Sequence, residues 1–162
     1  RTKFSCFHYN YTMHQLFSRQ NNPRSVWAAR VLIAIVLFWN LQAAVHFMLK
    51  PAVYAPSFQL QGVPGQVAMA GYGILFLMWQ VPYVFAVLHP GIFKISLWSA
   101  WIMQVIGVIA ESLLLSTIPG DYRLLRGSIT RFIIFDGAGV LILLGALVLV
   151  RREKCHSNTQ SG

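Results

Sequence analysis

Residues 127–150 read GSITRFIIFDGAGVLILLGALVLV, and Arg131 and Asp136 are the charged side chains of this stretch. A transmembrane helix needs about 20 mostly apolar residues to cross roughly 30 Å of hydrocarbon. The stretch is long and apolar enough, and it lacks the strict alternation of polar and apolar residues that is typical of membrane-barrel strands. It therefore predicts a membrane-spanning helix.

Three further stretches pass the same test of length and hydropathy. They cover residues 26–49, 67–88 and 92–118. Only helices and closed barrels satisfy their backbone hydrogen bonds in lipid, so all four stretches are predicted to be helices. The expected fold class is all-α, an integral membrane four-helix bundle formed by residues 26–150.

The composition of the whole chain agrees with this class. Of its 162 residues, 56% are hydrophobic and only 10% are charged, and the mean hydropathy is +0.57. About a quarter of the residues are charged in typical soluble proteins, so this chain could not cover a water-facing surface. The composition argues against a soluble enzyme and excludes a disordered chain. The net charge of +9 is expected to act on membrane orientation and does not indicate a nucleic-acid partner.

The positions of Lys and Arg predict the orientation, because cytoplasmic segments carry the excess of positive charge. Four spans place both termini on one side of the membrane. That side carries Arg1, Lys3, Arg19, Arg24, Arg30, Lys94, Arg151, Arg152 and Lys154, whereas the opposite side carries Lys50, Arg123 and Arg126. Both termini are therefore predicted to be cytoplasmic.

Both ends of the chain are basic. Residues 1–25 combine Arg and Lys with aromatic side chains and contain no acid and no apolar run of signal-peptide length. We expect a basic, aromatic arm on the membrane surface, with a partly disordered tail as the alternative. Residues 151–162 are expected to form a basic cytoplasmic tail. Cys6 and Cys155 fall on the same side, where thiols are kept reduced, and are read as unpaired.

Ionisable side chains inside a span are costly, so each is a candidate for function. Counting inward from the span ends at about 1.5 Å per residue places polar groups of all four spans in the outer third of the bilayer. These candidate ligand-binding residues are His46, Tyr72, Glu111, Arg131 and Asp136.

Three interpretations of this layer stay open. In the first interpretation, Arg131 pairs with Glu111 or Asp136, and the network only fixes how the helices pack. Alternatively, the layer lines a pocket that opens to the outer leaflet and holds the polar head of a quinone, sterol, lipid or pigment. The third interpretation is that it handles protons or ions. No zinc motif, phosphate-binding loop, nucleophile elbow or dinucleotide fingerprint occurs in the sequence, so no catalytic residue and no metal site is predicted.

A haem with two histidine ligands needs both histidines at one depth. His46 is predicted near the outer surface and His89 near the inner one, so the two cannot hold one haem within a single chain. A chlorin pigment needs only one axial ligand, which His46 is able to supply.

Other polar and special residues of the spans are predicted to act in packing. Asn40 and Gln104 are expected to bridge helices. Pro82 is expected to kink the second span and to free the carbonyl group near Met78, with Gln80 close enough to be its polar partner.

The stretch RVLIAIVLFWNLQAAVHFMLKPAVYAPSFQLQGVPGQVAMAGYGILFLMWQVPY, residues 30–83, resembles the small four-helix membrane proteins of the DoxX-like group. Those proteins share a first span that begins near an arginine, an interfacial loop with proline and aromatic residues, and a glycine-rich second span. Some members are linked to quinone-coupled oxidation, so the resemblance implies a lipophilic redox ligand, although no catalytic residue is carried over. MQVIGVIAES and RGSITRFIIFDGAG in the later spans resemble uncharacterised bacterial four-span proteins, which implies a bacterial inner membrane.

We therefore expect a non-enzymatic accessory or structural subunit, or a module that binds a lipophilic ligand, in a respiratory or photosynthetic membrane complex. The expected ligands are a quinone, a lipid or a chlorin pigment, and the expected partners are the lipid bilayer and other membrane subunits. The alternative is a quinone-linked membrane oxidoreductase or carrier that uses the outer-leaflet polar pocket.

Overall fold

The computed structural model describes the backbone of residues 23–159 and the side chains of residues 24–151. Every regular element in these ranges is helical, and their order is α2 (Pro23–Leu49), α3 (Pro51–Tyr54), the 3-10 turn η1 (Ala55–Phe58), α4 (Gly62–Met78), α5 (Val81–Leu88), α6 (Lys94–Thr117) and α7 (Arg123–Thr159). The predicted surface arm, except for its last residues, lies outside the described residues, as do Cys6 and the side chains of the basic tail after residue 151.

Four helical segments in the described part of the chain are long and apolar enough to cross a membrane. They contain 24 to 29 residues each and are Arg24–Leu49, Gly62–Leu88, Lys94–Thr117 and Arg123–Arg151. The predicted all-α class with four spans is confirmed. The chain is a multi-pass membrane protein by the length and hydropathy of these helices.

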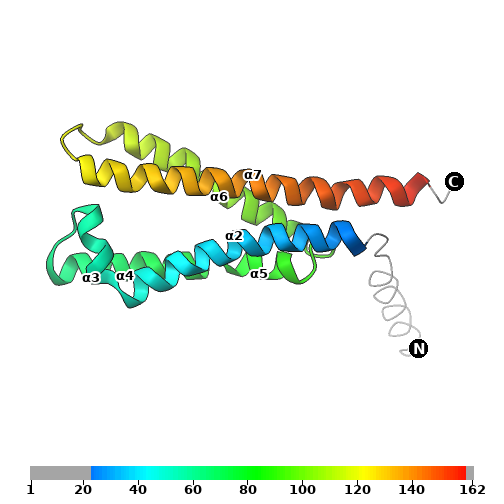
Figure 1. Ribbon diagram of the computed structural model, residues 1–162, viewed down its shortest axis with the longest axis horizontal. Coiled ribbons are helices and arrows are strands. Elements are labelled where there is room, and N and C mark those ends of the chain that lie inside the picture. The colour runs from blue at the N-terminus through cyan, green and yellow to red at the C-terminus, as the bar shows by residue number, and fades with distance from the viewer. Residues whose placement is uncertain (1–22, 160–162) are drawn as a thin grey trace, which may run out of the picture.

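The four spans form an elongated bundle (Figure 1). α6 and α7 form an antiparallel hairpin, and α2 packs against α4, α5 and α7, while α5 also contacts α6. The start of α2, the α5–α6 turn and the end of α7 lie toward one end of the bundle, which we call the terminal end. The opposite end, with α3, η1 and the α6–α7 turn, is called the α3 end.

The second span is interrupted between α4 and α5. Pro82 has no N–H group, so the carbonyl oxygen of Met78 lacks its usual helical donor. The side chain of Gln80 turns back and donates a hydrogen bond from Nε2 to the carbonyl oxygen of Phe76, at 2.7 Å. The predicted break near Pro82 is confirmed, and a side chain satisfies one of the backbone groups that it frees.

Three spans begin earlier than predicted, and α2 starts at Pro23 instead of Val26. α4 starts at Gly62 instead of Val67, because Gly62 adopts a left-handed φ of +64° that turns the chain into the helix. Pro64 fits in the first turn, where its missing N–H group has no helical partner to lose. α7 starts at Arg123 instead of residue 127. The interfacial segment between the first two spans is correspondingly short and is itself folded as α3 and η1.

The buried core changes character along the bundle. At the terminal end, aliphatic and small side chains of α2, α5, α6 and α7 pack around Tyr83, which is 2% exposed. At the α3 end, Phe47 and Met69 are buried among partly buried side chains from α3, η1, α4, α7 and the link between η1 and α4, namely Tyr54, Phe58, Leu60, Phe76 and Phe132. The α3 end is thus held together mainly by aromatic side chains.

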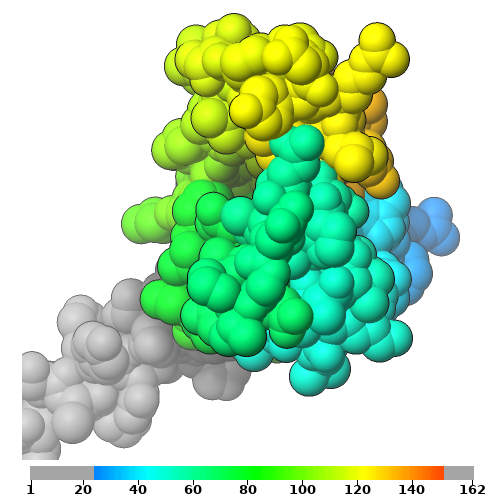
Figure 2. Space-filling model, turned by 90° about the vertical axis from the view of Figure 1, so that its left-hand side faces the viewer, coloured from blue at the N-terminus to red at the C-terminus, as the bar shows by residue number. Residues whose placement is uncertain are grey.

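The segment α3–η1 links the α2–α4 side of the bundle to α7. The hydroxyl group of Ser128 donates a hydrogen bond to the carbonyl oxygen of Ser57 at 2.7 Å. Figure 2 shows this segment, in teal, rising to meet the yellow start of α7 in the end-on view. The contact fixes one wall of the groove described below.

Candidate functional site

The five side chains predicted to share one layer lie in different environments. Asp136 is buried at 6% exposure, whereas Tyr72 is 51% exposed on α4 and Arg131 is exposed on α7. His46 is half-buried and stacks on Tyr54, with ring centroids 6.0 Å apart. Glu111 is half-buried on α6, near enough to Asp136 for the two carboxyl groups to interact electrostatically. The structure brings Glu111 and Asp136 together and places His46 and Arg131 near a separate groove.

Arg131 pairs with its own helix instead of with a carboxylate of the described chain. Its Nε donates to the carbonyl oxygen of Gly127 at 3.3 Å. Asp136 follows Arg131 by five residues, and only residues three or four apart are neighbours on a helix, so the two side chains leave α7 on different faces. Glu111 is on α6, whereas Arg131 faces the groove between α7 and α2. The interpretation of the layer as an Arg131 ion-pair network is not supported by this geometry.

A groove of about 370 Å³ lies between α2, α3–η1 and α7 at the α3 end. It is mostly apolar, with Arg131 as its charged side chain. Its lining residues are Ala43, Phe47, Val53, Tyr54, Ser57, Phe58, Ser128, Arg131, Phe132 and Phe135. We call it the aromatic groove.

The rings of the aromatic groove support one another. Phe47 lies edge-on to Tyr54 at 5.3 Å between centroids, and Phe132 lies 5.9 Å from both Phe47 and Phe58. Such tilted and edge-on pairs at 4.5–7 Å are favourable and hold each ring in place. Helices α2, α3 and α7 and the turn η1 thus contribute to one preorganised wall. These rings are not among the site residues predicted from the sequence, although all of them fall near the α3-side ends of the spans or in the segment that joins the first two.

A group of buried polar side chains lies deeper in the bundle, apart from the aromatic groove. The buried side chains are Asn40 of α2 at 3% exposure, Tyr83 of α5 at 2%, Gln104 of α6 at 5% and Asp136 of α7 at 6%. The hydroxyl group of Tyr83 donates to the carbonyl oxygen of Ala100 at 3.2 Å, and it interacts with the side chains of Asn40 and Asp136. With Gln80, which is 4% exposed, these residues form what we call the buried polar layer.

Two glycines make room for this layer between α6 and α7. A methyl group at Gly107 would collide with Oδ2 of Asp136 and lie 3.3 Å from its Cγ. A methyl group at Gly139 would collide with Nε2 of Gln104 and lie 3.1 Å from its Cδ. Each helix therefore places a polar side chain over a glycine of the other. Gln104 of α6 thus contacts α7 at Gly139, between the two helices.

Close contacts between the helices show the depth of the layer. Gly73 of α4 lies against Ala44 and Met48 of α2, and Gly145 of α7 lies against Leu32 of α2. Each helix rises by about 1.5 Å per residue, and α4 and α7 run antiparallel to α2. Counting seven residues on from Gly73 and nine back from Gly145 therefore places Gln80 and Asp136 at the level of Asn40. All of the spans thus contribute to this layer, which shares only Asp136 with the five residues predicted to form an outer layer.

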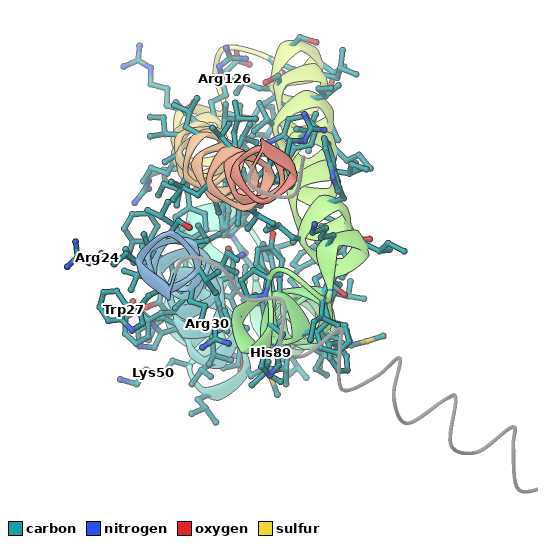
Figure 3. All side chains as sticks on the ribbon, turned by 90° about the vertical axis from the view of Figure 1, so that its right-hand side faces the viewer. Arg24, Trp27, Arg30, Lys50, His89 and Arg126 are labelled. Atoms are coloured by element: carbon teal, nitrogen blue, oxygen red, sulfur yellow. The ribbon has the colours of Figure 1, made fainter. Side chains whose placement is uncertain are left out.

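Arginines close the C-terminal ends of two spans. Arg30 donates from Nη2 to the carbonyl oxygen of Leu88 at 2.7 Å and lies 3.2 Å from Nδ1 of His89. Figure 3 shows Arg30 and His89 beside one another at the terminal end. At the other end, Arg126 donates from Nη1 to the carbonyl oxygens of Leu115 and Ile118, at 3.0 and 2.6 Å. These arginines neutralise the negative ends of helix dipoles and satisfy orphan carbonyl groups.

Within the described residues, no group of three or more His, Cys, Asp and Glu side chains is placed to hold a metal ion. His46 stacks on Tyr54 near α3, whereas His89 contacts Arg30 at the terminal end. The two histidines therefore lie toward opposite ends of the bundle, consistent with the argument against one shared haem.

The fold, the aromatic groove and the buried polar layer describe a helical protein with four candidate membrane spans. No protein-family model, curated protein or solved structure matches the chain.

Proposed function

We propose that the chain is a membrane-embedded accessory module that holds one amphiphilic ligand in the aromatic groove, within a larger energy-converting complex of the bacterial inner membrane. The observation that carries the proposal is the combination of aromatic walls with a single guanidinium group, that of Arg131, at the rim of the groove.

The chemistry of the groove fits a ligand with an apolar body and an acceptor head. A volume of about 370 Å³ falls in the range of small-molecule sites. The faces of Phe47, Phe58 and Phe132 suit a flat ring or an acyl chain. The guanidinium of Arg131 is exposed, and a planar guanidinium binds carboxylate, phosphate or carbonyl oxygens well. Among the expected ligands, a quinone and a lipid both satisfy this description.

The lining supports binding in preference to catalysis. The hydroxyl group of Ser128 is engaged by the carbonyl oxygen of Ser57, so it acts as a structural contact between α7 and η1. Arg131 is positively charged and serves as a donor, not as a base. These groups orient a ligand and do not pair a nucleophile with a general base. A non-enzymatic role is therefore favoured.

The proposed orientation places the termini in the cytoplasm and the aromatic groove in the outer leaflet. Arg30 and Arg151 lie at the terminal end, where Arg30 caps α5 and the guanidinium of Arg151 lies 4.9 Å above the ring of Trp98. Arginine and tryptophan side chains of this kind suit a cytoplasmic interface. The resemblance of residues 30–83 to DoxX-like proteins supports a quinone-type ligand. A C-terminal reporter that is active only outside the cytoplasm should stay inactive.

Native mass spectrometry of the full chain, purified in mild detergent, tests the ligand. We expect one bound amphiphile per chain, identified by extraction, and co-purifying membrane subunits. Arg131→Gln should weaken ligand affinity about tenfold and so lower the occupancy, because a charge-assisted hydrogen bond is lost. Arg123→Gln is the matched control, since Arg123 is an exposed arginine of the same helix outside the groove.

The outcomes separate the alternatives. Equal occupancy in the Arg131→Gln and Arg123→Gln proteins would contradict ligand binding by the groove. A chain that binds ligand but runs alone under mild conditions would remove the subunit role. A bound quinone that is reduced and reoxidised by the purified chain would favour the oxidoreductase or carrier.

A further inference from the structure

The buried polar layer concentrates oxygen atoms at the interruption of the second span. Asn40, Gln80, Tyr83 and Asp136 are all at most 6% exposed and lie at one depth. Pro82 leaves the carbonyl oxygen of Met78 without its helical donor at the same break. This layer is separate from the aromatic groove, which shares none of these residues.

Two of these oxygens lack a protein donor. Oδ1 of Asn40 and Oε1 of Gln80 are buried and have no hydrogen-bond partner within the described part of the chain. Buried acceptors are almost always satisfied, so each such atom calls for a donor or a cation. The unpartnered buried donor of the layer is Nε2 of Gln104, which lies against Gly139, one helical turn from Asp136.

The charges around Asp136 also favour a bound cation. Asp136 is buried, and its electrostatic neighbours are Tyr83 of α5 and Glu111 of α6, of which only Glu111 can add charge near neutral pH, and that charge is negative. Arg131 turns toward Gly127, away from Asp136. An ionised carboxylate inside the hydrocarbon layer is expensive unless a positive charge compensates it. The layer thus offers a negative charge and several neutral oxygens.

We propose that Asp136, Asn40 and Gln80 form an intramembrane binding site for a hard monovalent cation, with Na⁺ as the test ion. Carboxylate, amide and backbone carbonyl oxygens are the ligands that hard cations prefer. The single carboxylate of Asp136 balances one positive charge, whereas a divalent ion would need more. Interrupted helices in the middle of the membrane supply such oxygens in ion-binding membrane proteins.

Glu111 lies on the side of this site that faces the α3 end. It lies one helical turn from Gly107 toward the α3 end, and it is only half-buried. Its Oε2 is buried and has no hydrogen-bond partner in the described chain. A second carboxylate between Asp136 and the α3 end attracts cations toward the site from that side of the membrane.

Thermal unfolding of the purified full chain in detergent tests the site. Tryptophan fluorescence is recorded in NaCl and in choline chloride at constant ionic strength and pH. We expect Na⁺ to raise Tm by about 3–6 °C at about ten times its Kd, because a ligand that binds only the folded state stabilises it. Asp136→Asn should abolish the Na⁺-dependent rise, whereas Asp121→Asn, in the exposed α6–α7 turn, should keep it.

A direct binding measurement covers the case in which Asp136→Asn does not fold. Radioactive ²²Na⁺ should bind the wild-type chain at about one ion per chain, and unlabelled Na⁺ should displace it, whereas choline should not. A Tm that is identical in Na⁺ and choline, together with no ²²Na⁺ binding, would overturn the proposal. A Tm that responds only to pH would also overturn it and would assign the layer to a proton.

Discussion

Oδ2 of Asp136 on α7 lies directly against the Cα of Gly107 on α6, in the space that any larger residue at position 107 would occupy. Gln104 and Gly139 repeat this arrangement one turn away, with the roles of the two helices exchanged. The helices approach closely because each glycine accepts a polar side chain of its partner. The α6–α7 contact therefore depends on four residues that are coupled in pairs.

Gly107→Ala should destabilise the bundle. The new methyl group would lie 3.3 Å from Cγ of Asp136 and collide with Oδ2, so the buried Asp136 side chain must rotate or the two helices must move apart. Such overpacking costs about 1–3 kcal/mol, more than the roughly 1 kcal/mol that alanine gains in helix propensity. Thermal unfolding in detergent measures the change. Gly137→Ala is the control, because no atom lies within 4 Å of its new methyl group, and it should be neutral or stabilising.

Arg126→Gln should loosen the end of α6. The substitution removes the hydrogen bonds from Nη1 to the carbonyl oxygens of Leu115 and Ile118. Hydrogen bonds from a charged group contribute about 1.5–3 kcal/mol each in net terms, so we expect the loss of both to lower the unfolding free energy by about 3–6 kcal/mol. Hydrogen exchange of the last turn of α6 should rise as well. Arg123→Gln, at an exposed position, should leave both measurements unchanged.

Ser128→Ala should release η1 from α7. The hydroxyl group of Ser128 bonds the carbonyl oxygen of Ser57 across the bundle. Its loss should cost about 1 kcal/mol and increase hydrogen exchange in residues 55–60 selectively. Thr130→Ala is matched, since the hydroxyl group of Thr130 bonds only within its own helix, to the carbonyl oxygen of Arg126. Equal exchange in the two variants would show that the aromatic rings alone hold this segment.

Glu111→Gln should be tolerated. Oε2 of Glu111 has no hydrogen-bond partner among the described side chains, and Arg131 is bonded to Gly127 instead. Removing a carboxylate that has no cationic partner should leave the unfolding free energy unchanged or raise it, because an unpaired charge inside a span is costly. Breaking a buried ion pair would instead cost about 3–5 kcal/mol. Chemical unfolding distinguishes the two outcomes, and a loss of that size would restore the interpretation of Glu111 as a partner of Arg131.

The spans could be predicted from the sequence because hydrocarbon imposes a length and an apolar composition on each helix. Residues 26–49 and 67–88 fall within helical segments of the structure, and Pro82 marks the break because its ring removes a backbone donor. The ends of the spans were less predictable. Gly62 starts α4 by its backbone conformation, which hydropathy does not report.

The arrangement of polar side chains could be predicted only in part. Depth counted from span ends gives the level of a polar side chain in the membrane, but the rotation of each helix decides which side chains face its neighbours. Tyr72 and Asn40 are both polar residues of apolar helices, yet Tyr72 is 51% exposed and Asn40 is 3% exposed. Nearly uniform apolar sequences carry little information on rotation. The pairing of Gly107 with Asp136 arises from packing between helices and has no local signal.

Spans of 24 to 29 residues measure about 36–44 Å at roughly 1.5 Å per residue, which exceeds the roughly 30 Å of an ordinary hydrocarbon layer. The helix ends therefore extend into the headgroup regions, which bring the bilayer to about 40–45 Å, or the helices tilt within the hydrocarbon layer. Bilayer thickness is therefore expected to affect the α3 end, where the groove lies. A series of nanodiscs with acyl chains of increasing length varies this thickness directly.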